Sequence, residues 1–425
     1  MSRIDALIAE LCPNGIEFEP LKSIGVWYGG GTPSKSKLEY WQDGTIPWLS
    51  PKDMGKPVIE TTEDYITAEA VAGSATKLVP ANSVAVVVRS SILEKILPTS
   101  LVPMPVTLNQ DMKAVVSRDG ILPTYVAHLM RSRGPEILRA ARKTGGSVAS
   151  IEMPKLMAFR IPVPPLELQH EIVKVLDTFT KLEAELEAEL EARRQQYQYY
   201  RDLLLSFDER MLGASKQASK QASKQASIRW MTLSEIGEFI RGRRFTKADY
   251  VEDGVGCIHY GEIYTRFGTA TNSVISHVRS DMAGALRYAK PGDVVITDVG
   301  ETVEDVGKAV AWIGDKDVAI HDHCYAFRHS MNPKFVSYCM QTSSFIAEKA
   351  KYVARTKVKT LLIESFSRIR IPVPPLDEQE RIVAILDKFD ALVNDLSSGL
   401  PAEIAARRKQ YEHYRDRLLT FREAA

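Results

Sequence analysis

The sequence predicts an α+β protein: two mixed α/β domains joined by two long antiparallel coiled-coil helices, in a pseudo-twofold tandem duplication. The main observation is a repeat. Residues 161–182 and 371–392 align without gaps with 13 identities in 22 positions, and both copies begin Ile-Pro-Val-Pro-Pro-Leu. Residues 192–207 and 406–421 add 11 identities in 16 positions. A duplicated scaffold with diverged inserts is indicated, so function is expected in the inserts.

The repeats divide the chain into five parts. A first variable domain covers residues 1–160, and a Pro-rich junction with a long helix covers 161–212. A linker of residues 213–227 leads to a second variable domain, 228–370, and to a second junction and helix, 371–425. We call 161–212 and 371–425 the arms. A chain of 425 residues is too long for one hydrophobic core, which agrees with this division.

The composition is that of an ordinary soluble globular protein, with 44% hydrophobic and 26% charged residues. No run approaches 18 apolar residues and the first residues form no apolar signal region, so a cytoplasmic location is expected. Four cysteines without the spacing of a disulfide framework are expected to be reduced thiols: Cys12, Cys257, Cys324 and Cys339.

The net charge of +1 is unevenly distributed. Residues 1–160 and 227–360 each carry 18 Lys and Arg against 16 Asp and Glu, or +2 each. Residues 161–226 carry 9 against 11 and residues 361–425 carry 10 against 11, or −2 and −1. A polyanion is therefore expected on the variable domains rather than on the arms.

Both variable domains show short β-branched runs that follow proline turns. In the first, residues 83–88 follow Pro80; in the second, residues 293–297 follow Pro291. Each domain then closes with a helical stretch, at 124–142 and at 334–353. These patterns predict short strands with one or two helices in each domain.

Apolar residues recur every three or four positions along both arms, which predicts a coiled-coil seam. In the first arm they are Leu176, Phe179, Leu182, Leu186 and Leu190, and in the second Leu386, Phe389, Leu392 and Leu396. The second helix must break near Pro401, because proline removes an amide donor and clashes with the preceding turn. The second arm is longer by four residues, close to one helical turn. Helices of about 40 residues span roughly 60 Å, and antiparallel packing of the two is the simplest arrangement.

The linker contains the tetrapeptide Ser-Lys-Gln-Ala three times in succession, at residues 215–226. Lys, Gln and Ala favour helix, and none of these residues can build a core. An exposed helical or frayed extension is expected.

Two loops at matching places, 212 residues apart, are rich in glycine and in basic or hydroxyl side chains: residues 29–35 and 241–247. They lack the spacing of a P-loop, but backbone amides and Lys or Arg side chains of this kind contact phosphates. Residues 143–147 and 355–359 form a second such pair, each before a Pro-rich junction. The alternative for both pairs is a set of solvated turns.

The segment His321-Asp322-His323-Cys324, with Cys257 and His259 upstream, raises the question of a metal site. The spacing is too tight for a zinc ribbon, and polar residues at a strand end explain it better. Asn109-Gln110-Asp111 occupies the corresponding position in the first domain, so both segments are candidates for reading base edges. The predicted nucleic-acid contacts are Gly30, Thr32, Ser34, Lys35, Lys37, Asn109, Gln110, Lys143, Thr144, Ser147, Arg241, Arg243, Arg244, Lys247, His259, Tyr260, His321, His323, Arg355, Lys357 and Lys359.

No catalytic motif stands out. The sequence has no Gly-x-Ser-x-Gly, no adenine-methylation motif and no nuclease cluster of Asp, Glu and Lys. We therefore expect no catalysis, metal or cofactor in this chain.

The duplicated junctions Ile-Pro-Val-Pro-Pro-Leu, each followed by a long helix that closes with Arg-Arg-x-Gln-Tyr-x-x-Tyr-Arg-Asp, resemble the specificity subunit of type I restriction–modification enzymes. The resemblance covers essentially the whole chain. It implies two target-recognition domains held apart by antiparallel helices, each reading half of a split double-stranded DNA site.

The same resemblance implies the partners. Two modification subunits would dock on the helices and methylate adenine with S-adenosylmethionine, and restriction subunits would cleave DNA with ATP and Mg²⁺. The Ser-Lys-Gln-Ala repeat sits where some members carry tetrapeptides that set the half-site spacing, so removing one unit is expected to shorten the spacer by about one base pair. Two alternatives stay open at this point: a coiled-coil scaffold without DNA specificity, and a zinc-dependent nucleic-acid enzyme that uses the His321 cluster.

Overall fold

The computed structural model describes residues 3–143, 148–207, 228–354, 359–395 and 397–424. Within them the chain forms two compact units: unit 1 is Met1–Glu185 with Ile404–Ala425, and unit 2 is Leu186–Glu403. Each unit therefore holds one variable domain, half of the first arm and half of the second. Expectations about the linker 213–227 and about Leu396, Thr144, Ser147, Arg355 and Lys357 fall outside the described residues.

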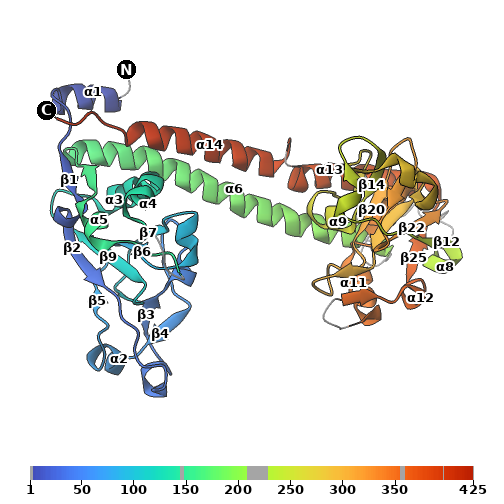
Figure 1. Ribbon diagram of the computed structural model, residues 1–425, viewed down its shortest axis with the longest axis horizontal. Helices are drawn as coiled ribbons and strands as arrows, with labels where there is room; N and C mark the ends of the chain where they lie inside the picture. The colour runs from blue at the N-terminus through green and yellow to red at the C-terminus, as the bar shows by residue number, and fades with distance from the viewer. Residues whose placement is uncertain (1–2, 144–147, 208–227, 355–358, 396, 425) are drawn as a thin grey trace, which may run out of the picture. The chain divides into compact units, whose positions relative to one another are not determined.

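Unit 1 is built from short strands and helices, as the sequence predicts (Figure 1). Its strands are β1 (Phe18–Pro20), β2 (Gly25–Gly29), β3 (Ile46–Leu49), β4 (Asp64–Ile66), β5 (Leu78–Val79), β6 (Ser83–Val87), β7 (Thr99–Val102), β8 (Val106–Leu108), β9 (Met112–Ser117) and β10 (Arg160–Pro162). Its helices are α1 (Arg3–Leu11), α2 (Ala68–Ala72), α3 (Pro123–Ser132), α4 (Gly134–Ala141), α5 (Met153–Ala158) and the first half of α6 (Leu166–Ser206).

Two four-stranded sheets form the body of this domain, in the orders β2-β9-β6-β7 and β4-β3-β8-β5. Strand β6 is buried along its whole length, because its β-branched residues face the core on both sides. Strands β3 and β8 run parallel, with Leu49 opposite Leu108. Both strands therefore end at the same edge of the sheet, and the residues after them, from Ser50 and from Asn109, share that edge.

Unit 2 repeats this plan. Its strands are β11 (Arg229–Thr232), β12 (Gly237–Arg241), β13 (Tyr250–Val251), β14 (Val255–Ile258), β15 (Ala270–Thr271), β16 (Ser276–Val278), β17 (Tyr288–Ala289), β18 (Val294–Thr297), β19 (Val299–Gly300), β20 (Ala309–Trp312), β21 (Val318–Ile320), β22 (Cys324–His329), β23 (Val353–Ala354), β24 (Lys359–Leu361) and β25 (Arg370–Val373). Its helices are α8 (Leu233–Ile236), α9 (Tyr260–Thr265), α10 (Pro333–Cys339), α11 (Ser343–Lys349), α12 (Ile363–Phe366), α13 (Leu376–Asn394) and the start of α14 (Leu400–Leu418).

The sheets of unit 2 correspond to those of unit 1. The orders are β12-β22-β18-β20-β15 and β13-β16-β14-β21-β17. Strands β14 and β21 run parallel, with Ile258 opposite Ile320. They match β3 and β8, so His259 and His321 follow two strands that end at one edge. In each unit the junction strand pairs with the strand that opens the domain: β10 with β1, and β25 with β11.

The first arm is one uninterrupted helix of 41 residues, α6, whereas the second arm is two helices of 19 residues, α13 and α14 (Figure 1). The break predicted near Pro401 is confirmed. The four extra residues of the second arm fall in this break, because α13 ends at Asn394 and α14 begins at Leu400. The expectation that they add one helical turn is therefore wrong. No helix in the described ranges is both long enough and apolar enough to cross a membrane.

The two arms are antiparallel within each unit. In unit 1 the ring of Phe179 stacks on that of Tyr414, with centroids 5.5 Å apart. In unit 2 the equivalent Phe389 stacks on Tyr200 at 5.7 Å. Each stack joins one helix to the other, so the repeated segments exchange partners: the start of each arm packs on the end of the other.

A glutamine near the start of each arm fastens the helix to its domain. The Gln169 side chain accepts a hydrogen bond from Leu122 N at 2.9 Å and donates to Pro164 O at 2.8 Å. The Gln379 side chain accepts from Asn332 N at 2.8 Å and donates to Pro374 O at 2.8 Å. Both side chains are buried, so the pairing satisfies polar groups that would otherwise be costly to bury.

The apolar seam is most deeply buried where an arm also meets a domain core. Leu176 and Leu386 are fully buried in the cores of unit 1 and unit 2. Leu182 is 42% exposed, so the expectation that the seam is buried along its whole length is wrong at this position. Heptad spacing predicts which side chains share a face, but it does not predict what covers that face.

A half-buried histidine contributes to the acid sensitivity of unit 2. His329 Nδ1 accepts a hydrogen bond from Met331 N at 3.2 Å, and burial lowers the pKa of His329 to about 4. Because the unfolded chain binds a proton near pH 6.5 and the folded chain does so only near pH 4, stability should fall as the pH drops through this window. The loss approaches ~3 kcal/mol.

Urea titrations at pH 7, 6, 5 and 4.5 measure this loss. His329→Gln should reduce the pH dependence of the unit 2 transition, and the part that comes from His321, whose pKa burial also lowers to about 4, should remain. An unchanged pH dependence in that variant would show that His329 is not its source.

Candidate nucleic-acid interface

In unit 2 the loop after β12 is held against the edge where β14 and β21 end. Gly242 N donates to Cys324 O at 2.9 Å, and Arg243 N donates to Ile320 O at 3.0 Å. A side chain on Gly242 would place its Cβ 2.1 Å from His321 O, so only glycine allows this approach. The loop and the His321 segment, far apart in sequence, therefore form one surface.

His321 fixes the conformation of this loop. Its side chain is only 6% exposed, and burial lowers its pKa to about 4, so the ring is neutral. Nε2 donates to Phe245 O at 3.1 Å; Nδ1 accepts from His323 N at 3.2 Å and also lies 2.9 Å from Asp322 Oδ1. With both ring nitrogens engaged, His321 positions its neighbours and has no free nitrogen to offer a base.

His259 and Tyr260 lie beside it. His259 Nδ1 accepts from Gly261 N at 3.0 Å, so the neutral ring carries its hydrogen on Nε2. The His259 ring lies 4.6 Å from that of His321 and 4.1 Å from that of Tyr260. Among the described residues, no group of three His, Cys, Asp or Glu side chains is arranged to hold a metal ion.

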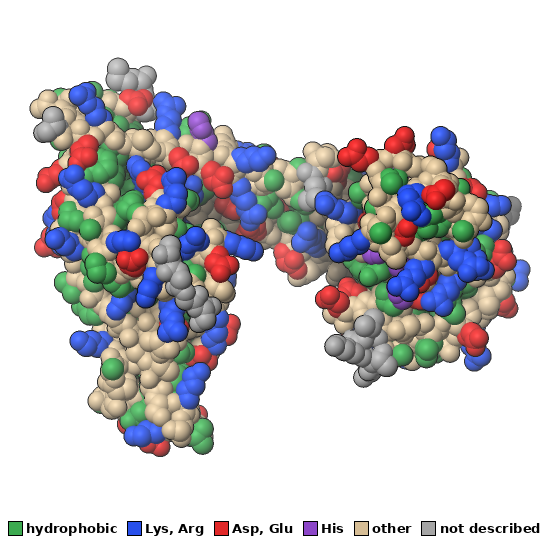
Figure 2. All heavy atoms as spheres, in the orientation of Figure 1, with side chains coloured by type: hydrophobic (Ala, Val, Ile, Leu, Met, Phe, Trp, Pro, Cys, Tyr) green, Lys and Arg blue, Asp and Glu red, His purple; other side chains and the backbone are tan. Residues whose placement is uncertain are grey.

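These side chains line a hollow of about 400 Å³. The residues around it are Arg244, Phe245, Thr246, Lys247, Tyr250, His259, Tyr260, His321, Asp322 and His323. Six of the predicted contacts thus meet at one place, with two cations at the rim. Figure 2 shows histidine side chains on the surface of unit 2, with Lys and Arg side chains around them.

The four basic residues of the loop have different roles. Arg243, Arg244 and Lys247 are exposed. Arg241 is held by the protein: its Nε donates to Asp322 O at 3.0 Å, and its Nη2 lies 3.5 Å from Asp298 Oδ2. The first three are available to contact phosphate oxygens, whereas Arg241, although half exposed, is held by Asp322 and Asp298.

Unit 1 carries the equivalent surface. Gly31 N donates to Leu108 O at 2.8 Å, and a Cβ on Gly30 would lie 1.8 Å from Asn109 O. The side chain of Thr32 donates to Gln110 Oε1. The predicted correspondence between Asn109-Gln110-Asp111 and His321-Asp322-His323 therefore holds in space: each triplet lies under a glycine of its loop.

The remaining predicted contacts in and just after the first loop are Ser34, Lys35 and Lys37. Lys35 is exposed. Lys37 Nζ donates to Tyr40 Oη at 3.1 Å, and this hydrogen bond raises the pKa of Lys37. Ser34 Oγ lies 2.8 Å from Ser36 Oγ. Ser34 and Lys35 thus present a hydroxyl and a cation.

The second pair of predicted loops is described only at its edges. Lys143 is exposed and follows α4, where its N–H donates to Ser150 O at 2.8 Å. Lys359 begins β24, opposite Gly300 of β19. The structure places both residues on their own domains, and whether they contact nucleic acid remains a prediction.

The predicted contacts did not include four residues that line the hollow, Phe245, Thr246, Tyr250 and Asp322, or Asp298, which pairs with His323. The ring of Phe245 meets the rings of Tyr250 and His321 edge-on. A local signal existed for the loop, because Thr246 and Asp249 form a reciprocal capping box. None existed for Asp298, which reaches His323 from a neighbouring strand end.

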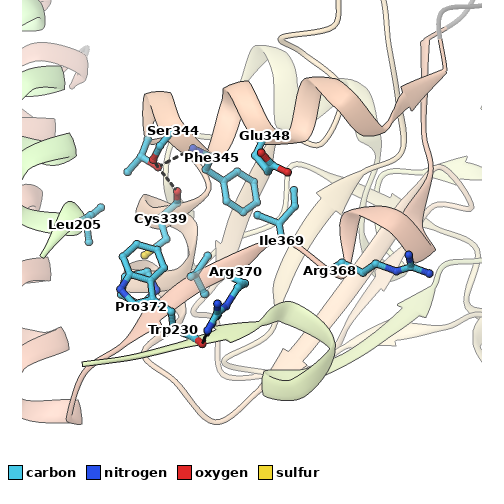
Figure 3. Close-up of a pocket in the computed structure, with 12 residues that line it drawn as sticks. Leu205, Trp230, Cys339, Ser344, Phe345, Glu348, Arg368, Ile369, Arg370 and Pro372 are labelled. Carbon is cyan, nitrogen blue, oxygen red and sulfur yellow. Dashed lines mark hydrogen bonds between the residues drawn. The ribbon is translucent and has the colours of Figure 1, made fainter. Parts of the chain in front are cut away.

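Unit 2 has a second hollow, of about 350 Å³, away from this surface (Figure 3). Trp230, Phe345 and Ile369 are among the side chains that line it, and Arg370 Nε donates to Trp230 O at 3.2 Å. In unit 1 the equivalent Arg160 pairs with Glu423 at 2.6 Å. The hollow belongs to the junction between arm and domain.

Comparison with known proteins gives one consistent family. The profile described as "Type I restriction modification DNA specificity domain" matches twice, at residues 13–192 and 228–406. The Escherichia coli type I restriction enzyme EcoR124I/EcoR124II specificity subunit is 58% identical over 196 residues, which are 45% of this chain and 48% of that protein. The E. coli EcoprrI specificity subunit is 26% identical over 401 residues, 90% of each chain.

Solved structures agree on the fold. A chain from a structural study of the assembly and conformational transition of a type I restriction–modification system has a TM-score of 0.64 at 17% identity and covers 96% of this chain and 98% of its own. The S subunit from M. genitalium has a TM-score of 0.51 at 15% identity and covers 95% and 96%. Because the family model matches twice and covers most of the sequence, this chain belongs to the DNA specificity subunits of type I restriction–modification systems.

Proposed function

We propose that this chain selects the DNA sequence for a type I restriction–modification complex, with one half of a split duplex site bound by each unit. The observation that supports it is the surface present in both units, where a glycine loop lies over a strand-end triplet and exposed cations stand beside polar groups able to contact base edges. Cations of this kind bind phosphates and fix the register, and side chains at the base edges read the sequence.

The same proposal assigns the partner subunits and the function of each. Two modification subunits dock on the arms, whose middle part exposes Leu182 and Leu392 in addition to charged residues. Restriction subunits join the full complex. The chain itself is non-catalytic, and S-adenosylmethionine, ATP and Mg²⁺ are bound by the partner subunits.

The two exposed arginines of the unit 2 loop test the DNA contact. We expect Arg243→Ala and Arg244→Ala each to weaken duplex binding. The slope of log K against log salt should fall by about one for each phosphate that is no longer neutralised. An arginine that contacts a base in two places should instead cost roughly 1–3 kcal/mol and relax one position of the site. Fluorescence anisotropy across a salt series, with the chain in complex with its modification subunits, measures both effects.

Lys316→Ala is the matched control. Lys316 is exposed on the same unit but precedes β21, so it lies at the opposite end of that strand from His321. Its slope should equal that of the wild type. Wild-type binding by both arginine variants at every salt concentration would show that this loop does not contact DNA.

A further inference from the structure

Each unit has a strand-end triplet, residues 109–111 in unit 1 and 321–323 in unit 2. The third residue of the triplet occupies the same place in both units. Asn109 Oδ1 accepts a hydrogen bond from Asp111 N at 2.7 Å. His321 Nδ1 accepts from His323 N at 3.2 Å. The same turn is thus closed by different side chains, and Asp111 and His323 occupy equivalent places after β8 and β21.

Asp298 determines which ring nitrogen of His323 donates a hydrogen bond and which one accepts. His323 Nδ1 lies 3.0 Å from Asp298 Oδ1, and the Asp298 side chain is 6% exposed. Burial raises the pKa of Asp298, whereas His323 and Arg241, whose Nη2 lies 3.5 Å from the other oxygen, favour the ionised carboxylate. A carboxylate only accepts, so the ring hydrogen sits on Nδ1 and Nε2 carries a lone pair. The His323 side chain is 39% exposed and lines the hollow, so this acceptor is available.

Asp111 also offers a hydrogen-bond acceptor, because its side chain is a carboxylate. Its carboxylate only accepts hydrogen bonds. Oδ1 is buried and has no hydrogen-bond partner among the described residues, but the residue as a whole is partly exposed, so a base would meet the other carboxylate oxygen. Both units therefore present an acceptor, and no donor, at the equivalent place.

We propose that Asp111 and His323 each accept a hydrogen bond from the amino group of a base, adenine N6 or cytosine N4, in the major groove of its half-site. The proposal rests on the proposed function. In the major groove only adenine and cytosine present an amino donor, whereas guanine O6 and N7 and thymine O4 are acceptors. A guanine or thymine at either contact would face an acceptor, so affinity should fall by about 5- to 100-fold.

A matched pair of variants tests the polarity. Asp111→Asn gives unit 1 an amide that can also donate. Asp298→Asn lets the new amide donate to His323 Nδ1, which moves the ring hydrogen to Nε2. Each change replaces a carboxylate by an amide of the same shape. We expect each variant to admit guanine or thymine at one position of its own half-site and to leave the other half-site unchanged.

The readout is the methylated motif in host DNA, with the chain co-expressed with its modification subunits, followed by binding to duplexes that carry each base at the altered position. His323→Glu and His323→Lys extend the test on this half-exposed side chain, once each variant is shown to fold by its unfolding transition. The first keeps an acceptor and should keep the wild-type base. The second offers only donors and should prefer guanine or thymine.

The outcomes are separable. A wild-type motif in Asp111→Asn and Asp298→Asn, or the same base preference in His323→Glu and His323→Lys, overturns the polarity and leaves the DNA-reading function standing. Wild-type complex that methylates DNA without a two-part motif overturns the proposed function itself.

Discussion

Replacing Leu386 by aspartate should unfold unit 2 and leave unit 1 folded, and Leu176→Asp should do the reverse. The two leucines occupy equivalent positions of the repeat, and both are fully buried in their own cores. A buried carboxylate without a partner costs several kcal/mol, roughly 4 or more, which is a large share of the roughly 5–15 kcal/mol that holds a domain together. Calorimetry with limited proteolysis should show that each variant lacks one transition, and assembly with modification subunits should fail in both.

Leu182→Asp serves as the control for these variants. The same substitution in the same helix falls on a side chain that is 42% exposed, so both transitions should survive. An intact unit 2 transition in Leu386→Asp would mean that the arm does not contribute to that core.

Exchanging residues 1–155 for the corresponding block of another specificity subunit should change one half of the methylated motif completely and leave the other half untouched. The strand-end surface of unit 1 lies entirely inside this block, and that of unit 2 lies outside it. Sequencing of methylated host DNA measures the motif. A chimera in which both halves change, or neither, contradicts the assignment of one half-site to each unit.

The stability of such a chimera depends on a contact between the exchanged block and the arms. His128 Nε2 lies 2.8 Å from Asp177 Oδ1, and its Nδ1 lies 3.1 Å from Tyr411 Oη, so one side chain of the block touches both arms. Burial lowers the pKa of His128. A donor block without histidine at this place loses both hydrogen bonds, and restoring histidine at position 128 should raise the stability of the chimera without changing the motif.

The fold was predictable from the sequence wherever a local pattern decides the structure. The duplicated junctions indicated the two units, Pro401 indicated the break in the second arm, and the matched glycines indicated the paired loops. The correspondence of Asn109 with His321 was also readable, because both follow a β-branched strand and precede another. Each of these features depends on backbone geometry that a few neighbouring residues determine.

Tertiary partners were not predictable in this way. Spacing placed Leu182 on the seam but did not reveal its exposure. Arg241 had the same sequence signal as Arg243, yet it pairs with Asp298, which is distant in the chain. Asp298 sets the tautomer of His323 and carried no signal at all. Long-range polar pairs of this kind depend on the packing of whole sheets, which single-sequence patterns do not contain.

The interrupted second arm also has a consequence for how the gene can vary. An insertion within the continuous helix α6 turns all later residues by about 100° and shifts them by about 1.5 Å per added residue, so only additions near whole turns keep both of its ends in register. Helix α13 ends at Asn394 and α14 begins at Leu400, so the connection between them is free of that restriction. Natural variants of this chain should therefore carry insertions and deletions of any length at 395–399, but only of about 4, 7 or 11 residues between positions 177 and 200.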